Sequence, residues 1–371
     1  MEKVDFQEEN DCSVRKNDRY ERKTDFFPFP GCFPGSEWYI AGNSNIKQGS
    51  FYAENDCQPF RCTETACRGE MEMSLIAFVL ILASVVLHAL WHFISKSRKP
   101  VPAFFLLVSG ACLCTTLPFA LTSGIDFHLL PGRFWLMVLG GAFCGVVCDI
   151  GLSCAYRRAD VSLAYPLARA LPVLMTAFLT ILFGIGKNPA PMALFGMLVI
   201  MIGCVMMPMK SFSDLHWKNY WNKALLGVFT AALGTTGYTI FDSEGVRLLY
   251  ECEPIPRWHG AATYSCIRES CLASMLLVYV LCVPHERAQI TKDLFLHPHP
   301  YLAGVFAGIA YLLVLIAMGF VSNVSFIQAF RQMSLPVGVI LGILFLKEKC
   351  LPTKLAGVVL VVAGLIITAT A

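Results

Sequence analysis

The apolar body of the chain, residues 71–371, carries the same five-helix plan twice, and this repeat constrains the possible folds more than any other feature. The fourth segment of the first copy reads AYPLARALPVLMTAFLTILF (164–183), and that of the second reads SFIQAFRQMSLPVGVILGILFL (325–346). Five spans are an odd number, so the second copy must enter a membrane in the opposite direction. Inverted repeats are typical of secondary transporters, whose substrate site lies at the repeat interface near the middle of the bilayer.

Each fourth segment leads through a short basic link into a helix with spaced glycines, ALFGMLVIMIG in the first copy and KLAGVVLVVAG in the second. Gly196 and Gly203 are seven residues apart, as are Gly357 and Gly364. This spacing places both glycines of a pair on one helix face, where a neighbouring backbone can approach closely. We expect these two helices to brace the outside of the bundle.

The composition indicates a membrane protein, because 56% of the residues are apolar and only 15% are charged, against about 25% charged in soluble domains. About 20 apolar residues are needed to cross a hydrocarbon core of about 30 Å. Ten segments qualify: 75–94, 101–122, 133–155, 161–183, 191–209, 224–241, 261–283, 301–320, 324–346 and 351–371. We therefore predict an all-α, multi-pass protein of the plasma (inner) membrane, in contact with lipid, with five-helix repeats at 71–210 and 211–371.

Residues 1–70 differ in kind from the body. They are charged, rich in Pro, Gly and Asn, and lack helical periodicity. Cys57, Cys62 and Cys67 are separated by four residues each, which is not a usual zinc-binding spacing, and no histidine lies nearby. We expect this segment to be disordered or not part of the functional protein, with a small metal or disulfide module as the alternative.

Four motifs in the body resemble those of the drug/metabolite transporter superfamily, specifically its ten-helix EamA-type permeases. The matching residues are His88, Ala89, Trp91 and Lys96; Tyr165, Pro166, Leu167, Ala168 and Arg169; Tyr238, Thr239, Asp242, Gly245 and Arg247; and Arg331, Ser334, Lys347 and Glu348. Two departures are His92, where that family usually has Asn, and the stretch 184–187, where many relatives carry Glu. The resemblance covers about residues 74 to 371 and implies transport of a small metabolite or drug, with cytoplasmic termini.

The distribution of basic residues argues for the opposite orientation. The links after the odd-numbered predicted helices hold thirteen Lys and Arg, and those after the even-numbered ones hold four. By the positive-inside rule this bias would place both termini outside the cytoplasm. We give more weight to the resemblance and predict cytoplasmic termini.

Arg169 and Arg331 lie at corresponding places in the two repeats, near Pro172 and Pro336. An arginine within a span is costly and usually faces a cavity or a partner. The pair could line a central cavity suited to carboxylate or phosphate, which a guanidinium binds through two parallel hydrogen bonds. Alternatively, each arginine pairs with an internal acid such as Asp149 or bonds carbonyls that the prolines leave free.

Other polar side chains within the spans are further candidates for the cavity wall. His88 and His92 share one helix face, because they are four residues apart, and Trp91 is adjacent. They could form a metal pair or a proton relay, but we expect them to make polar contacts between helices. Tyr238 and Asp242 form the equivalent pair in the second repeat. The remaining candidates from the fourth and ninth segments are Tyr165 and Gln328.

Asp149 and Glu269 are the acids best placed for proton coupling, because a carboxylate buried in low dielectric can exchange a proton in the physiological range. The alternative is a permanent ion pair, Glu269 with Arg268 or Asp149 with an arginine across the bundle. No ATP-binding motif is visible, so an ion gradient or exchange would supply the energy.

Two other classes were considered for these residues, an integral-membrane enzyme and a channel. The sequence has no Gly-rich phosphate loop and no His-Glu-x-x-His motif, and the repeat argues against both classes. The net charge of +3 is too small to indicate nucleic-acid binding. We therefore expect a transporter, not an enzyme, that needs no metal or other cofactor. It would move a small organic solute, which can be anionic, by alternating access, as a monomer or homodimer.

Overall fold

The structure is a computed structural model that describes residues 74–371, except for 97–100, 159–160, 208, 210–222, 254 and 347–350. The described residues all belong to one unit of the chain, Phe60–Ala371. The predictions for residues 1–70, including Cys57, Cys62 and Cys67, lie outside this described part.

The described residues form helices and no strand, which confirms the all-α class. The longer helices are α1 (Leu75–Lys96), α2 (Pro102–Leu121), α3 (Gly132–Arg158), α4 (Val161–Phe183), α5 (Pro191–Met206), α7 (Lys223–Cys252), α8 (Arg257–Cys282), α11 (His299–Met318), α13 (Ser334–Leu346) and α14 (Pro352–Thr370). The shorter ones are η2 (Phe127–Leu129), α9 (Pro284–Arg287), α10 (Lys292–Leu296), α12 (Val324–Phe330) and η4 (Arg331–Met333).

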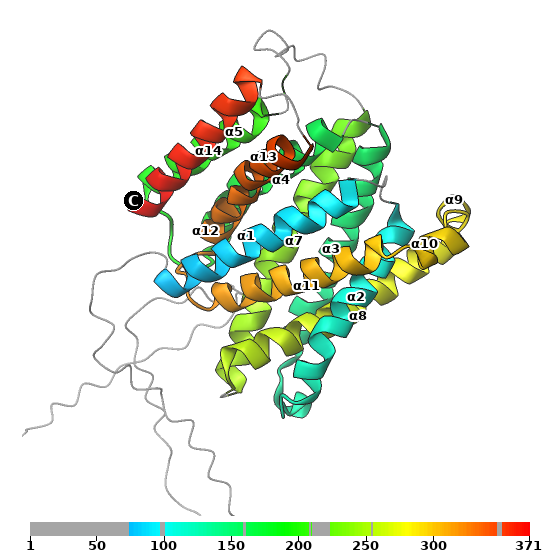
Figure 1. Ribbon diagram of the computed structural model, residues 1–371. Helices are drawn as coiled ribbons and strands as arrows, with labels where there is room; N and C mark the ends of the chain where they lie inside the picture. Colours follow the sequence, from blue (N-terminus) through cyan, green and yellow to red (C-terminus); the bar gives the residue numbers. More distant parts are fainter. Residues whose placement is uncertain are drawn as a thin grey trace, which may run out of the picture. The chain divides into compact units, whose positions relative to one another are not determined.

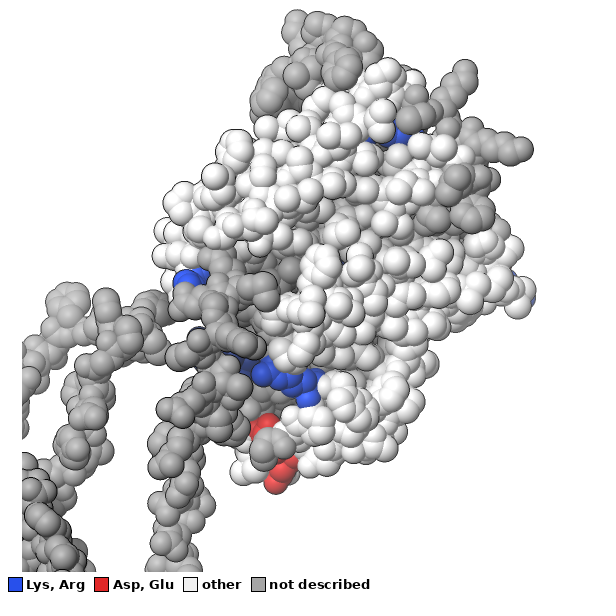
Figure 2. Space-filling view, turned by 60° about the vertical axis from the view of Figure 1, so that its left-hand side comes forward, with Lys and Arg blue, Asp and Glu red and all other residues white. Residues whose placement is uncertain are grey.

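Five helices in the described residues are long and apolar enough to cross a membrane: α2, the Gly132–Ala155 part of α3, α8, α11 and α14. Leu75–Trp91, Ala168–Phe183 and Pro191–Met206 are shorter apolar helices. Large apolar side chains point outward, for example Phe143 at 60% exposure and Phe178 at 65%. Figure 2 shows one face on which nearly all of the described surface is free of charged side chains. These features are those of an all-α membrane protein.

The helices pack in five main pairs: α3 with α7, α5 with α14, α1 with α11, α2 with α8, and α2 with α11. In Figure 1, α1 (blue) lies alongside α11 (orange), and α14 (red) lies beside α5 (green) at one edge. The pairing of α5 with α14 uses the predicted glycine faces. A Cβ at Gly203 would lie 2.7 Å from the carbonyl oxygen of Gly357, and one at Gly364 would lie 2.7 Å from that of Gly196.

The predicted ninth segment, 324–346, is not one continuous α-helix. The α-helix α12 gives way to the 3-10 turn η4 at Arg331–Met333 before α13 begins. Proline has no N–H group, so Pro336 cannot bond the carbonyl four residues earlier, which belongs to Gln332. In the same turn, the carbonyl of the preceding residue, Arg331, accepts a 2.9 Å hydrogen bond from Ser334 Oγ. The interruption thus lies at the arginine that the sequence singled out.

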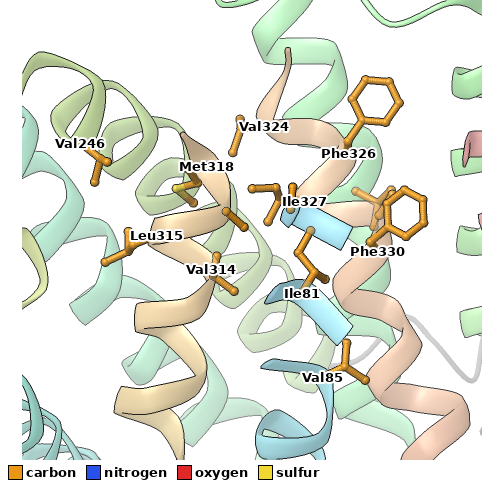
Figure 3. Close-up of a cluster of buried hydrophobic side chains, with 14 of the residues drawn as sticks. Ile81, Val85, Val246, Val314, Leu315, Met318, Val324, Phe326, Ile327 and Phe330 are labelled. Atoms are coloured by element: carbon orange, nitrogen blue, oxygen red, sulfur yellow. The ribbon is translucent and has the colours of Figure 1, made fainter. Parts of the chain in front are cut away.

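One half of the bundle is filled by apolar side chains, part of which are drawn in Figure 3. We call this group the apolar plug: Ala77, Ile81, Val85, Val246, Leu249, Val314, Leu315, Met318, Val324, Ile327 and Phe330. These residues come from the first half of α1, the ends of α7 and α11, and all of α12. Each is at most 8% exposed, so this half contains a closed core.

Candidate substrate cavity

A cavity of about 150 Å³ lies between the helices in the other half of the bundle. Its wall includes His88 from the second half of α1, Phe105 from the first half of α2, Leu152 from the second half of α3, and Arg169 from the first half of α4. Helices joined by short links run in opposite directions, so these halves lie at the same end. The cavity is therefore bounded on one side by the apolar plug.

The wall combines apolar and charged side chains. Trp91, Val108 and Leu272 contribute apolar surface. The charged side chains on the wall are Asp149, Arg169, Arg268, Glu269 and Arg331. Charges among apolar helices are costly and usually mark a pathway or a partner, so the contacts of each one decide what the cavity can bind.

Arg331 is 4% exposed and contacts His88 on the facing helix. Its Nη2 lies 2.9 Å from His88 Nε2. A guanidinium can only donate, so Nε2 must accept and the ring proton is on Nδ1. That nitrogen lies 3.2 Å from both the carbonyl and the hydroxyl oxygen of Ser84. His88 is therefore a neutral ring that positions Arg331.

The other two guanidinium nitrogens of Arg331 have no such contact. Nε and Nη1 are buried and make no hydrogen bond with any described residue. The guanidinium lies 5.8 Å from the ring centre of Tyr311, and Arg331 forms no ion pair with a described carboxylate. Arg331 thus brings to the cavity wall a positive charge that no described carboxylate neutralises.

Arg169 makes contacts of a different kind, although it also lines the cavity. Its Nη2 donates to the carbonyl oxygen of Arg331 at 3.1 Å and to Ser334 Oγ at 3.0 Å. These acceptors belong to the interrupted part of the ninth segment. The contact matches the alternative in which an arginine bonds a carbonyl near a proline, and it connects α4 to η4.

Arg268, which the sequence suggests only as a partner for Glu269, lies at the centre of a buried network. Its Nε is 3.4 Å from Asp242 Oδ2, and its Nη1 pairs with Glu269 Oε1. The rings of Tyr238 and Tyr311 each lie 5.2 Å from its guanidinium. The only sequence signal for this residue was an Arg–Glu pair within an apolar span.

Two predicted wall residues lie behind the wall. Asp242 is fully buried and accepts hydrogen bonds from Tyr264, at 2.9 Å, and from Tyr311. Gln328 is 2% exposed and donates to Thr239. Neither lines the cavity, because neighbouring side chains fill the space in front of them. Asp242 reaches the site only through Arg268 and Tyr311.

The two predicted proton-coupling acids have different surroundings. Glu269 pairs with Arg268 and accepts a 3.1 Å hydrogen bond from Ser109. This is the permanent pair considered as the alternative. Asp149 lines the cavity and makes no hydrogen bond or ion pair with the residues that the structure describes.

The remaining predicted residues divide into two groups. Trp91 and Tyr238 line the cavity. The side chains of His92 and Tyr165 lie outside the described part of the structure. Among the described residues, no group of three His, Cys, Asp or Glu could hold a metal ion.

Comparison with known proteins supports the fold. No family model matches the chain, and no curated protein matches it. One crystal structure of another protein is similar to this chain, with a TM-score of 0.56 and 17% sequence identity. The match covers 79% of this chain and 96% of the other. At this identity the similarity concerns the fold alone, and it shows that nearly the whole of that chain shares this helical arrangement.

Proposed function

We propose that the chain is a secondary transporter of the EamA type, which moves a small organic solute across the plasma (inner) membrane by alternating access. The observation that carries the proposal is the buried guanidinium of Arg331, which forms no ion pair with a described carboxylate, at the wall of a cavity among apolar helices. Burying a charge among apolar helices is costly, so such a charge usually marks a functional site, and solute binding is a function that fits it.

The helix pairing supports ten spans in two inverted repeats. Taken in order, the spans are α1, α2, α3, α4 and α5, followed by α7, α8, α11, the interrupted α12–α13 segment and α14. The third span of each repeat packs on the first span of the other, α3 on α7 and α11 on α1. The second spans pack on each other, as do the fifth. This reciprocity is expected when a pseudo-two-fold axis relates two halves.

The arrangement of cavity and plug supports alternating access. The cavity occupies one half of the bundle, and the apolar plug closes the half beside it. A carrier alternates between states open to opposite sides, and an inverted repeat can provide both by exchanging the roles of its two halves. The interrupted ninth segment next to the cavity is also a recurring feature of carrier binding sites.

The cavity indicates the size of the solute and a place for energy coupling. An engineered apolar cavity of about 150 Å³ binds benzene, so the solute in this conformation has on the order of ten non-hydrogen atoms or fewer. The positive charge of Arg331 on the wall suits an anionic group. If transport is coupled to protons, Asp149 is the more available acid, because Glu269 is held by Arg268 and Ser109.

The test is a thermal-shift screen of the purified protein against a metabolite library, followed by tracer uptake in proteoliposomes. A ligand stabilises the state that it binds, and a carrier should show saturable uptake and counterflow. Flux without saturation would indicate a channel. Chemical conversion of the stabilising ligand would indicate a membrane enzyme. Either result would contradict the proposal.

A further inference from the structure

The link between α11 and α12, residues 319–323, is held by three elements at the end of the bundle that the apolar plug fills. The main-chain N–H of Ser74, just before α1, donates to the carbonyl oxygen of Phe320 at 3.3 Å. Arg257, at the start of α8, donates to the carbonyl oxygen of Gly319, and its guanidinium lies 4.1 Å from the ring centre of Phe320. The third element is the link between α4 and α5, which belongs to the first predicted repeat.

Asn323 joins these two links through hydrogen bonds of its side chain. Its Nδ2 donates to the carbonyl oxygens of Ile185, at 3.2 Å, and Lys187, at 3.1 Å. Its Oδ1 accepts from the main-chain N–H of Ser325 at 2.8 Å and from Thr180 Oγ1 at 3.3 Å. The side chain is shielded from water, because Asn323 is 2% exposed. One end of the amide thus caps α12, and the other end holds the link after α4. We call the two bonds from Nδ2 the Asn323 clasp.

The two links also touch through their backbones at Gly186. This residue has a φ of 72°, in the left-handed region that glycine adopts without strain. A Cβ at Gly186 would lie 2.6 Å from the carbonyl oxygen of Ser322. The same carbonyl accepts a 3.0 Å hydrogen bond from the main-chain N–H of Lys187. The links can therefore approach this closely only because residue 186 has no side chain.

The Asn323 clasp lies at the boundary of the apolar plug. Asn323 directly precedes α12, which contributes Val324 and Ile327 to the plug, and Met318 at the end of α11 belongs to it as well (Figure 3). Apolar contacts are not directional, whereas hydrogen bonds need a defined geometry. The clasp therefore fixes one relative position of the two links, which the plug by itself does not.

We propose that the Asn323 clasp is the latch of the plugged end, which holds the two predicted repeats together there and must open before that end can open. This inference rests on the proposed function, because it names the contact that alternating access would break. When one repeat rocks against the other, the contacts that join the repeats at the closed end have to separate. A pair of neutral hydrogen bonds suits this task, because each contributes only modestly to stability in water and can be broken reversibly.

The test measures how fast a thiol inside the plug reacts with N-ethylmaleimide in the purified, full-length protein, with the labelled site read by mass spectrometry. Val314→Cys supplies the thiol, since Val314 is fully buried in the plug and does not line the cavity. It lies within α11, so fraying of the link alone does not expose it. The native Cys204, fully buried in α5, reports unfolding.

Two variants open the latch in different ways. Asn323→Ser removes both donors of the clasp and keeps a hydroxyl that can cap α12. It should raise the labelling rate of the plug thiol at least about tenfold, because each lost hydrogen bond is worth several-fold in an equilibrium constant. Gly186→Ala keeps Asn323 but forces the links apart, so it should raise the rate as well. Cys204 should stay unreactive in both.

Gly184→Ala is the matched control for Gly186→Ala. Gly184 has a φ of 63°, so alanine meets similar backbone strain there, but nothing lies within 4 Å of its Cβ. The labelling rate should stay close to that of the parent protein. An unchanged rate in Asn323→Ser or Gly186→Ala would overturn the proposal. An equal rise in Gly184→Ala would also overturn it, because strain within one link would then explain the effect.

Locking the latch decides the question if a variant unfolds and Cys204 reacts. Lys187→Cys combined with Ser322→Cys places two thiols on backbones that are hydrogen-bonded to each other. The disulfide should block counterflow in proteoliposomes, and reduction should restore it. Counterflow at the reduced rate with the disulfide closed would refute the latch and leave a transporter. Faster labelling of the plug in the clasp variants, without counterflow by the reduced protein, would leave the latch and refute transport.

Discussion

The guanidinium of Arg169 donates a 3.1 Å hydrogen bond to the main-chain carbonyl oxygen of Arg331. The sequence predicts corresponding places for the two arginines in two repeats, yet one side chain hydrogen-bonds to the backbone of the other residue. Arg169 therefore positions the interrupted ninth segment, and Arg331 presents its side chain to the cavity. The two arginines therefore have different structural roles.

The first prediction concerns this pair. Arg169→Ala and Arg331→Ala should each abolish transport while the protein still inserts and purifies. Arg169→Ala should also lower the free energy of unfolding by about 1–3 kcal/mol, because two buried acceptors lose a charged donor. Uptake and thermal unfolding measure the two effects. Wild-type transport by either variant would contradict a role for the pair.

A second prediction concerns Arg268 and its two carboxylates. Arg268→Ala should destabilise the protein by about 3–5 kcal/mol, because removing one partner leaves buried charges without compensation. Arg247→Ala is the control, since Arg247 also pairs with two acids, Glu244 and Glu251, but its side chain is 49% exposed. The control should lose about 1 kcal/mol or less. Equal unfolding temperatures for the two variants would refute the buried network.

The glycine contact between α5 and α14 leads to a third prediction. In Gly203→Ala the new Cβ would lie 2.7 Å from the Gly357 carbonyl oxygen and 2.9 Å from the Val361 nitrogen. Both are backbone atoms, so the helices must separate and the unfolding temperature should fall. Gly338→Ala is the matched control, because nothing lies within 4 Å of a Cβ there, and alanine favours the helix by about 1 kcal/mol. If both variants behave alike, close packing does not hold α5 against α14.

The orientation in the membrane remains a prediction from the sequence. We expect cytoplasmic termini, which places Ser213, outside the described residues, on the outer side. A single cysteine introduced by Ser213→Cys, in a background without other accessible thiols, should react with an impermeant maleimide on intact cells. Labelling that appears only after lysis would mean that the charge bias was the correct guide.

The last prediction concerns residues 1–70. Their composition suggests that they are dispensable, so a truncated protein that begins at Met71 should insert and transport like the full chain. Expression and tracer uptake are the measurements. Normal insertion with loss of transport would show that the segment has a function.

The sequence alone predicted the features that depend on local pattern. Long apolar runs predict helices wherever they occur, because a backbone without water must satisfy its hydrogen bonds within the segment. The glycine spacing of α5 and α14 predicted their close faces, since residues seven apart share one side of a helix. Charges within apolar runs, such as Arg331 and Asp149, were recognisable as site candidates because of the cost of burying them.

The tertiary structure decided the features that depend on which helices meet. Arg268 joins Asp242 across two helices, and Arg169 reaches the Arg331 carbonyl from a helix 162 residues away in sequence. No local pattern encodes such distances. Asp242 and Arg331 both looked like cavity residues in the sequence, but packing buried one behind tyrosines and left the other facing the cavity. Periodicity gives the face of a helix, whereas only the packed bundle determines what that face meets.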